Sequence, residues 1–237
     1  VRLLRDVELD ASSAGSRSGA INISGSKNLT IDGATHIIKA VSNFNRDTNT
    51  SWATVGDHHV INIEGGATVA IQNLTIDGGW DGDTVDTAES FNAARSGINV
   101  WENNNATVTL QNVKINKCST YAVTANGSTV NIDGLTTTGN RWGLDVEDGS
   151  TVTIETANIA EDVVYESSSE TSSLTIHDGT YGTVKVQQQG SGETKGTVSI
   201  NGGNVNKVTT DVDDGTKATA NVTVTGATVG TVNNTSA

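Results

Sequence analysis

Apolar and polar residues alternate strictly in a short phrase that returns six times between Thr107 and Gly230. In chain order the phrase reads TVTLQN, TVNIDG, TVTIET, SLTIHD, TVSING and NVTVTG, and its apolar anchors are Leu110, Ile132, Ile154, Ile176, Ile200 and Val224. Successive anchors are roughly 22 to 24 residues apart, a spacing typical of repeat proteins. Alternation with a period of two predicts a strand with one buried face. A repeat this short, with no helical pattern inside it, predicts an all-β solenoid with one coil per repeat.

The alternation also assigns each residue of a phrase to a face. The residues predicted to point inward are Val108, Leu110, Val130, Ile132, Val152, Ile154, Leu174 and Ile176. Those predicted to point outward are Thr107, Thr109, Thr129, Asn131, Thr151, Thr153, Ser173 and Thr175. Outward Thr pairs on stacked coils would form a flat grid, which leaves ice binding open as a minor alternative function. Stacked Thr also simply favours strand formation.

Two longer steps precede the regular repeats. The step from the anchor Ile31 to Ile71 and the step from Ile71 to Leu110 are each about 40 residues long, so each carries one extra loop beyond the repeat unit. We place these loops at Ser42–His59 and Gly78–Ser96. Each loop follows the same strand of its coil and precedes the same next strand, so we expect both loops at the same corner of the solenoid.

The ends of the chain read differently from the repeats. The alternating segment Val1–Asp10 is expected to cap the first coil. Residues 231–237 look like the start of a polar linker. We therefore expect residues 1–237 to form a single domain of about eight coils, with both insertions at one corner.

Composition narrows the class of protein. The 237 residues include 26 Gly and no Pro, which suits many tight turns between uninterrupted strands. A formal net charge of −13 argues against nucleic acid as a partner. No apolar run approaches the ~20 residues that a membrane span needs, and no signal peptide starts at Val1, so we expect a mature or excised fragment. Cys118 is the single cysteine, which excludes an internal disulfide and favours a small core residue.

Several segments carry a resemblance to a known family. The strings NLTIDG followed by HII, GATVAIQNLTIDGG and NRWGLDVEDGSTVTI resemble the right-handed parallel β-helices of the pectin-lyase-like superfamily, most of all the repeat domains of bacterial surface adhesins. The resemblance covers essentially the whole chain. It implies a right-handed solenoid with three strands per coil. That superfamily includes lyases, hydrolases, tailspikes and non-catalytic adhesins, so the fold alone does not give the function.

The catalytic motifs of the related enzymes do not transfer to this chain. Polygalacturonase-like hydrolases carry NTD, DD, GHG and RIK motifs on successive coils, and this set does not occur here. Pectate lyases combine calcium-binding carboxylates with an arginine base, for which the nearest match is a loose set of acids with Arg141. The resemblance therefore favours a binding protein over an enzyme.

The loop corner concentrates unusual side chains. It is expected to hold Arg46, Trp52, His58, His59, Trp80, Asp81, Asp83, Asp86, Glu89, Arg95, Lys117, Arg141 and Trp142. The strand that follows is expected to add outward pairs in three coils: Asn99 with Trp101, Tyr121 with Val123, and Asp145 with Glu147. Exposed aromatic faces stack on sugar rings, while carboxylates, amides and Arg fix hydroxyl positions. The alternative is that Trp52 and Trp80 only pack the loops onto the solenoid.

Metal binding is not expected. The run from Asp77 to Asp86 superficially resembles a calcium loop, but its spacing departs from the EF-hand pattern and solvated loop acids are the preferred interpretation. His58 and His59 are adjacent, so on a strand they face opposite sides and cannot easily share an ion. We expect neither a metal nor a cofactor.

Asp145 and Glu147 raise the question of catalysis. They lie two positions apart on one strand face, about 7 Å between Cα atoms, within the range of carboxyl pairs in glycoside hydrolysis. The sequence offers no obvious third carboxylate near them, so we expect no catalytic residues and no enzymatic activity. A polysaccharide lyase or glycoside hydrolase acting on an acidic glycan remains the alternative.

These observations lead to one functional prediction. The chain is expected to be a non-catalytic, extracellular adhesin domain on a bacterial cell surface, part of a longer protein, without a membrane span in this fragment. Its expected partner is a host or plant glycan, or a glycoprotein on a host or neighbouring cell. The predicted ligand-binding residues are Trp80, Asn99, Trp101, Tyr121, Arg141, Trp142, Asp145 and Glu147.

Overall fold

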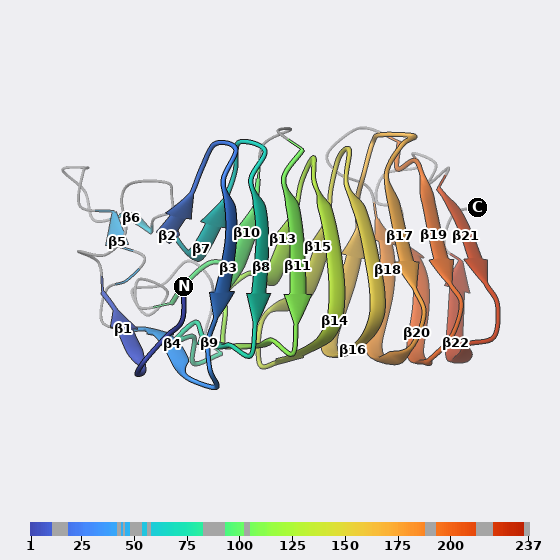
Figure 1. The fold of residues 1–237 in the computed structure, drawn as a ribbon. Helices are drawn as coiled ribbons and strands as arrows, with labels where there is room; N and C mark the ends of the chain where they lie inside the picture. Colours follow the sequence, from blue (N-terminus) through green and yellow to red (C-terminus); the bar gives the residue numbers. More distant parts are fainter. Residues whose placement is uncertain are drawn as a thin grey trace.

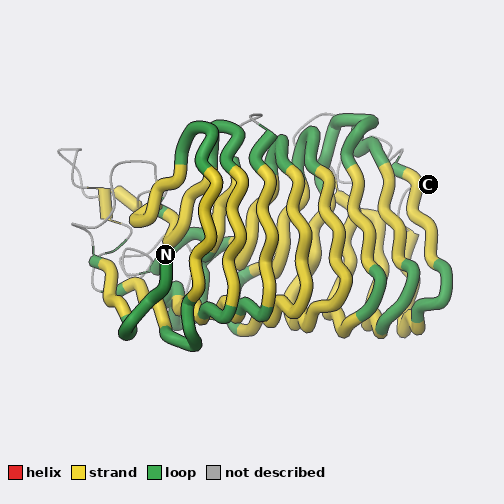
Figure 2. The backbone as a smooth tube through the Cα atoms, viewed as in Figure 1, coloured by secondary structure: helices red, strands yellow, loops and turns green. Residues whose placement is uncertain are grey.

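The computed structural model describes residues 1–10, 19–41, 44, 46–47, 54–55, 58–82, 93–101, 105–187, 193–211 and 220–234. This part of the chain contains no helix, and its strands stack in parallel along one axis as a β-helix (Figures 1 and 2). A small antiparallel pair, β5 (Arg46–Asp47) with β6 (Thr54–Val55), is separate from the solenoid sheet. The all-β solenoid predicted from the repeats is therefore confirmed.

Each coil contributes strands to three faces. The first face consists of β3 (Asn28–Asp32), β8 (Thr68–Gln72), β11 (Thr107–Gln111), the starts of β14 (Thr129–Thr138) and β16 (Thr151–Tyr165), β17 (Ser173–Ile176), β19 (Thr197–Ile200) and β21 (Asn221–Val224). The second face consists of β1 (Val7–Leu9), β4 (Ile37–Ala40), β9 (Thr75–Asp77), β12 (Lys114–Asn116), the end of β14, the middle of β16, and the starts of β18 (Gly179–Gln187), β20 (Asn204–Asp211) and β22 (Thr228–Asn234).

The third face carries the candidate site. It consists of β2 (Gly19–Ile23), β7 (His59–Ile63), β10 (Ile98–Val100), β13 (Tyr121–Ala125), β15 (Trp142–Val146) and the ends of β16, β18, β20 and β22. Strand β16 turns through all three faces without a break, so it forms almost a whole coil by itself.

The register of the first face agrees with the repeat anchors. Paired residues run Ile31, Ile71, Leu110, Ile132, Ile154, Ile176, Ile200 and Val224 in adjacent strands. The described residues thus contain eight stacked coils on this face. The same pairs reproduce both the regular steps and the two long steps that were counted between anchors in the sequence.

The core is the column of inward aliphatic side chains. Val130, Ile132, Val152 and Ile154 are at most 1% exposed, as the alternation predicts. Their outward neighbours, such as Thr129 and Asn131, are partly or fully exposed. Burial of an aliphatic side chain contributes roughly 1.5 to 3 kcal/mol, so stability accumulates coil by coil.

Cys118 belongs to the same core. Its side chain is fully buried, as expected of a small core residue, and this burial raises the pKa of its thiol above the ordinary range. A buried thiol that stays protonated is a poor nucleophile and a poor metal ligand. The single cysteine therefore has a packing role.

Both long insertions occupy the same connection. One joins β4 to β7 and the other joins β9 to β10, and each pair links the second face to the third. The next two coils make this connection with only a few residues, between β12 and β13 and between β14 and β15. The shared corner is confirmed. Of the acids and aromatics predicted there, Trp52, Asp83, Asp86 and Glu89 lie outside the described residues.

The two ends of the described solenoid differ. At the N-terminal end, β1 pairs with β4 and the Leu3 amide donates to the Asp32 carbonyl oxygen, so the first residues line the edge of the first coil. At the other end, Val224 and Val232 are 40% and 67% exposed, although their equivalents one coil earlier are buried. The described residues contain no helix, and therefore none that could cross a membrane.

Candidate functional site

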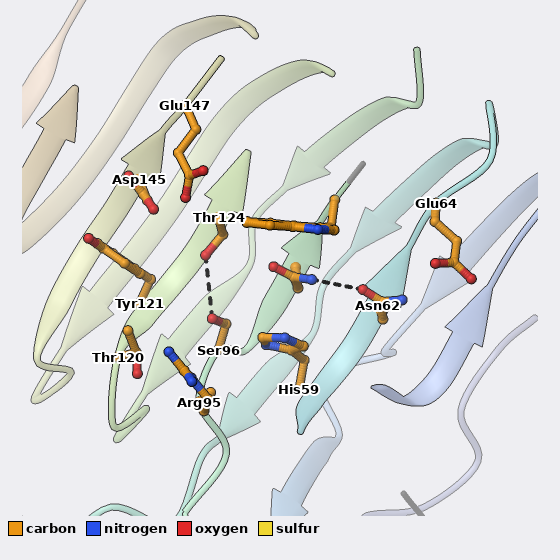
Figure 3. Close-up of a pocket in the computed structure, with 12 residues that line it drawn as sticks. His59, Asn62, Glu64, Arg95, Ser96, Thr120, Tyr121, Thr124, Asp145 and Glu147 are labelled. Carbon is orange, nitrogen blue, oxygen red and sulfur yellow. Dashed lines mark hydrogen bonds between the residues drawn. The ribbon is translucent and has the colours of Figure 1, made fainter. Parts of the chain in front are cut away.

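A groove of about 360 Å³ lies on the outward surface of the third face (Figure 3). Its walls come from four consecutive coils, through β7, β10, β13 and β15 and the residues at their ends. The lining side chains are His59, Asn62, Glu64, Arg95, Ser96, Asn99, Trp101, Thr120, Tyr121, Thr124, Asp145 and Glu147. Polar and aromatic groups therefore replace the Thr and Ser that cover the first face.

The register arranges these side chains in columns that run across the coils. Asn62, Asn99, Thr124 and Asp145 occupy one column, because each pairs with the next in adjacent strands. A second column follows two positions later in each coil and holds Glu64, Trp101, Asn126, Glu147 and Glu166. The backbone amide of each of these residues donates to a backbone carbonyl oxygen of the preceding coil. Neighbouring members of a column are about 4.8 Å apart, the spacing of adjacent strands.

An amide ladder holds the first column at its N-terminal end. The side chain of Asn99 donates to Oδ1 of Asn62 at 2.8 Å, and the side chain of Asn62 donates to Oδ1 of Asn22 at 3.0 Å. Asn62 and Asn99 are 5% and 6% exposed. Amide side chains both donate and accept, so stacked Asn residues satisfy one another and fix the floor of the groove.

Aromatic side chains border the groove. Trp101 is 41% exposed and is one of the few large apolar side chains on the described surface. Tyr121 stacks on Trp142 of the next coil, and the Arg141 guanidinium lies 4.1 Å from the centroid of the Trp142 ring. Trp142 does not line the groove, and it lies beside Tyr121 because the two residues pair in adjacent strands.

Three carboxyl groups gather at one end of the groove. One oxygen from each of Asp145, Glu147 and Glu166 lies within 4.8 Å of the other two, and we call this set the acid trio. Asp145 and Glu147 are 1% and 6% exposed. Two amides flank the trio: Asn126 donates to Glu147 at 2.6 Å, and Gln187 donates to Glu166 at 2.6 Å.

The acid trio is electrostatically strained. Burial raises the pKa of Asp145 well above its ordinary value, and the neighbouring carboxylates of Glu147 and Glu166 raise it further. Burial also raises the pKa of Glu166, although the hydrogen bond from Gln187 opposes this shift. Negative charges this close in a poorly solvated site cannot all persist without a proton or another cation.

The structure gathers five of the eight predicted ligand-binding residues into the groove, namely Asn99, Trp101, Tyr121, Asp145 and Glu147. Trp142 stacks on Tyr121, and Arg141 lies against the Trp142 ring, so both residues are next to the groove. Trp80 lies outside the groove, in a more open hollow of about 520 Å³ at the corner between the second and third faces, together with Lys39, Asp77, Asp81, Lys117 and Asn140.

Two sequence-based assignments at this site are wrong. Val123 does not face outward: it is fully buried, and Thr124 takes the outward position, because Val123 pairs with the core residues Ile98 and Leu144. The acid pair also does have a third member. Glu166 was missed because the coil from β15 to β16 is shorter than its neighbours, so the position equivalent to Glu147 comes sooner than the regular repeat predicts.

The adjacent histidines have different surroundings, although only His59 belongs to strand β7. His58 lies against Phe44, whose carbonyl oxygen is 2.9 Å from its Nδ1, and the two rings meet edge to face. His59 instead lines the groove. They therefore cannot bind one metal ion together.

Comparison with family models, with curated proteins and with solved structures gives no match for this chain. The fold and the groove define a parallel β-helix protein with a polar and aromatic groove on its third face. Of what the resemblance implied, the parallel β-helix fold is confirmed.

Proposed function

We propose that this chain is a non-catalytic carbohydrate-binding domain of a bacterial surface adhesin, and that the groove is its ligand site. The observation that carries the proposal is the exposed face of Trp101 beside a column of amide, hydroxyl and carboxyl groups. Sugars present both an apolar ring face and a rim of hydroxyl groups. A site that binds them needs an aromatic platform and convergent hydrogen-bonding groups.

The shape of the groove supports an extended ligand. It crosses four coils, with side chains repeating at about 4.8 Å, so a linear chain could contact each coil in turn. The backbone beneath is a continuous sheet whose hydrogen bonds fix the columns. Little conformational entropy is then lost from the protein on binding.

The proposed partner is a glycan or glycoprotein on a host or neighbouring cell, met outside the bacterium. An acidic, elongated β-helix suits this role because it presents a rigid side surface without attracting nucleic acid. The location and the partner rest on the resemblance to adhesin repeats and on the groove together.

Cleavage of a glycan is the second candidate function, and Glu166 is the observation that favours it. A third carboxyl beside Asp145 and Glu147, with the pKa of Asp145 raised, could supply a general acid. The geometry fits binding better. Carboxyl groups that cleave a glycosidic bond flank that bond, whereas the acid trio is gathered at one end of the groove.

A glycan array with the purified chain tests the proposed function. Trp101→Ala is expected to weaken binding of the best glycan by roughly 1 to 3 kcal/mol, the contribution of a buried aromatic contact. Trp80→Ala is the matched control, because Trp80 lies in the hollow at the corner and does not line the groove. Equal binding by both variants, with both folded by circular dichroism, would contradict the assignment of the groove.

A further inference from the structure

The acid trio has an unusual environment for three carboxyl groups. Oδ1 of Asp145 is buried and has no hydrogen-bond partner among the described residues. Among the described residues, the ion pairs are Arg2 with Asp32, His36 with Asp6, and Lys195 with Glu170. None of them includes Asp145 or Glu166. A buried carboxylate oxygen without a partner loses its hydration with no compensating contact. The site is therefore incomplete.

The surrounding groups do not complete it. The side-chain amides of Asn126 and Gln187 donate to Glu147 and Glu166, and neither of these hydrogen bonds reaches Oδ1 of Asp145. The positive charge of Lys185 lowers the pKa of Glu166. Lys185 lies in the first column, which continues from Asp145 through Val164 to Lys185. Tyr121, also near Asp145, has its hydroxyl pKa raised by burial and offers no positive charge.

We propose that the acid trio is a binding site for a single cation at the end of the groove. The cation could come from either of two sources with the same chemistry: a divalent metal ion from solution, or the ammonium group of an amino sugar lying in the groove. This inference goes beyond the expectation that the chain binds no metal. The ammonium source rests on the proposed function, whereas the metal source does not.

The spacing of the oxygens agrees with either source. Oxygens that share a calcium ion at about 2.3 to 2.6 Å lie up to about 5 Å apart, which covers the separations in the acid trio. Carboxylates are the oxygen ligands that such hard cations prefer, and water from the open groove can fill the remaining positions. An ammonium group offers three donors and could contact one oxygen from each carboxyl group.

The first experiment titrates calcium chloride alone into metal-depleted protein and measures heat. We expect one site, and we expect Glu166→Gln to weaken it at least tenfold. Glu155→Gln is the matched control, because Glu155 is an exposed acid of strand β16 and lies outside the acid trio. Asp145→Asn provides a second test if Glu166→Gln does not fold.

The second experiment uses the same proteins with a chelator present and compares glucosamine oligosaccharides with their N-acetylated forms. Tighter binding of the free amine by at least tenfold, lost in Glu166→Gln, assigns the cation to the ligand. Calcium binding that depends on Glu166 assigns it to a metal ion.

If neither calcium nor the amine depends on Glu166, the inference is wrong. Binding of N-acetylated oligosaccharides that requires Trp101 but not Glu166 would then leave the proposed function standing. Conversely, calcium binding without any glycan binding supports the cation site and removes support from the proposed function.

Discussion

The ring of Tyr121 lies on the ring of Trp142 from the next coil, with centroids 5.0 Å apart and planes inclined by 29°. The pair joins the groove to the next coil, since Tyr121 lines the groove whereas Trp142, which contacts Arg141, does not. Stacked aromatic pairs contribute about 0.5 to 1.5 kcal/mol beyond their buried area. Trp142 therefore holds Tyr121 in place at the groove.

Replacing Trp142 should weaken glycan binding without unfolding the chain. In Trp142→Ala, Tyr121 loses its support and becomes free to change rotamer, so the affinity for the best array glycan is expected to fall by about 1 kcal/mol. Trp142→Phe keeps an aromatic partner and should retain most of the affinity. Isothermal titration provides the measurement, and unchanged binding by Trp142→Ala would refute the supporting role.

Ile154→Asp should strongly destabilise the solenoid. Ile154 is fully buried between Ile132 and Ile176 of the adjacent coils, so a carboxylate there has neither water nor a partner. The expected cost is several kcal/mol, of the order found for buried unpaired charges. Thr151→Asp changes an exposed position of the same strand and should cost less than about 1 kcal/mol. Urea unfolding measures both, and equal midpoints would exclude this register.

Asn140→Ala should destabilise the corner between the second and third faces. The buried Asn140 side chain accepts from the Cys118 amide at 2.9 Å and donates to the Ile115 carbonyl oxygen at 3.1 Å. Its loss leaves two backbone groups unsatisfied, at about 1 to 3 kcal/mol each. Asn131→Ala on the exposed first face is the control, and a similar melting temperature for both variants would contradict this role.

The acid trio should make stability depend on pH. The pKa of Asp145 is raised by folding, so its ionisation opposes the folded state. In a chelator, stability should be unaffected by this group below its ordinary pKa of about 3.8 and should fall as pH rises from there through the raised value. Asp145→Asn should remove this fall and melt higher at pH 7. A lower melting temperature for the variant at pH 7 would contradict the direction of the shift.

We also expect no glycan cleavage. Incubation with pectins or with the array glycans should release neither new reducing ends nor unsaturated uronates, because the acid trio gathers at one end of the groove instead of flanking a bond. Turnover that disappears in Asp145→Asn would establish the second candidate function instead.

The sequence alone was enough to predict the stacking of the coils. Alternation in the repeated phrase assigned Val152 and Ile154 to the core, and counting between anchors reproduced the pairing of Ile31 with Ile71 across a long insertion. This works because a parallel strand must bury the same face as its neighbours, so the apolar pattern fixes the register.

The groove was only partly predictable, for two physical reasons. The start of a strand can carry a side chain that leaves the alternation, as Tyr121 does, and this shifted Val123 to the wrong face. Coils also differ in length, so the neighbour of Glu147 is found only when the backbone pairing is known. Trp80 and Trp101 look alike in the sequence, and only the structure shows that Trp101 lines the groove whereas Trp80 lies in the hollow at the corner.

The shared corner of the two long insertions has a consequence for how such a protein can vary. Because both insertions lie between strands, before β7 and before β10, their length and sequence can change while the hydrogen-bonded register on either side stays the same. The groove on the third face would keep its columns through such changes. Related chains could therefore diverge in these loops without rebuilding the columns, and only the part of the groove wall formed by His59, Arg95 and Ser96, at the ends of the insertions, would change with them.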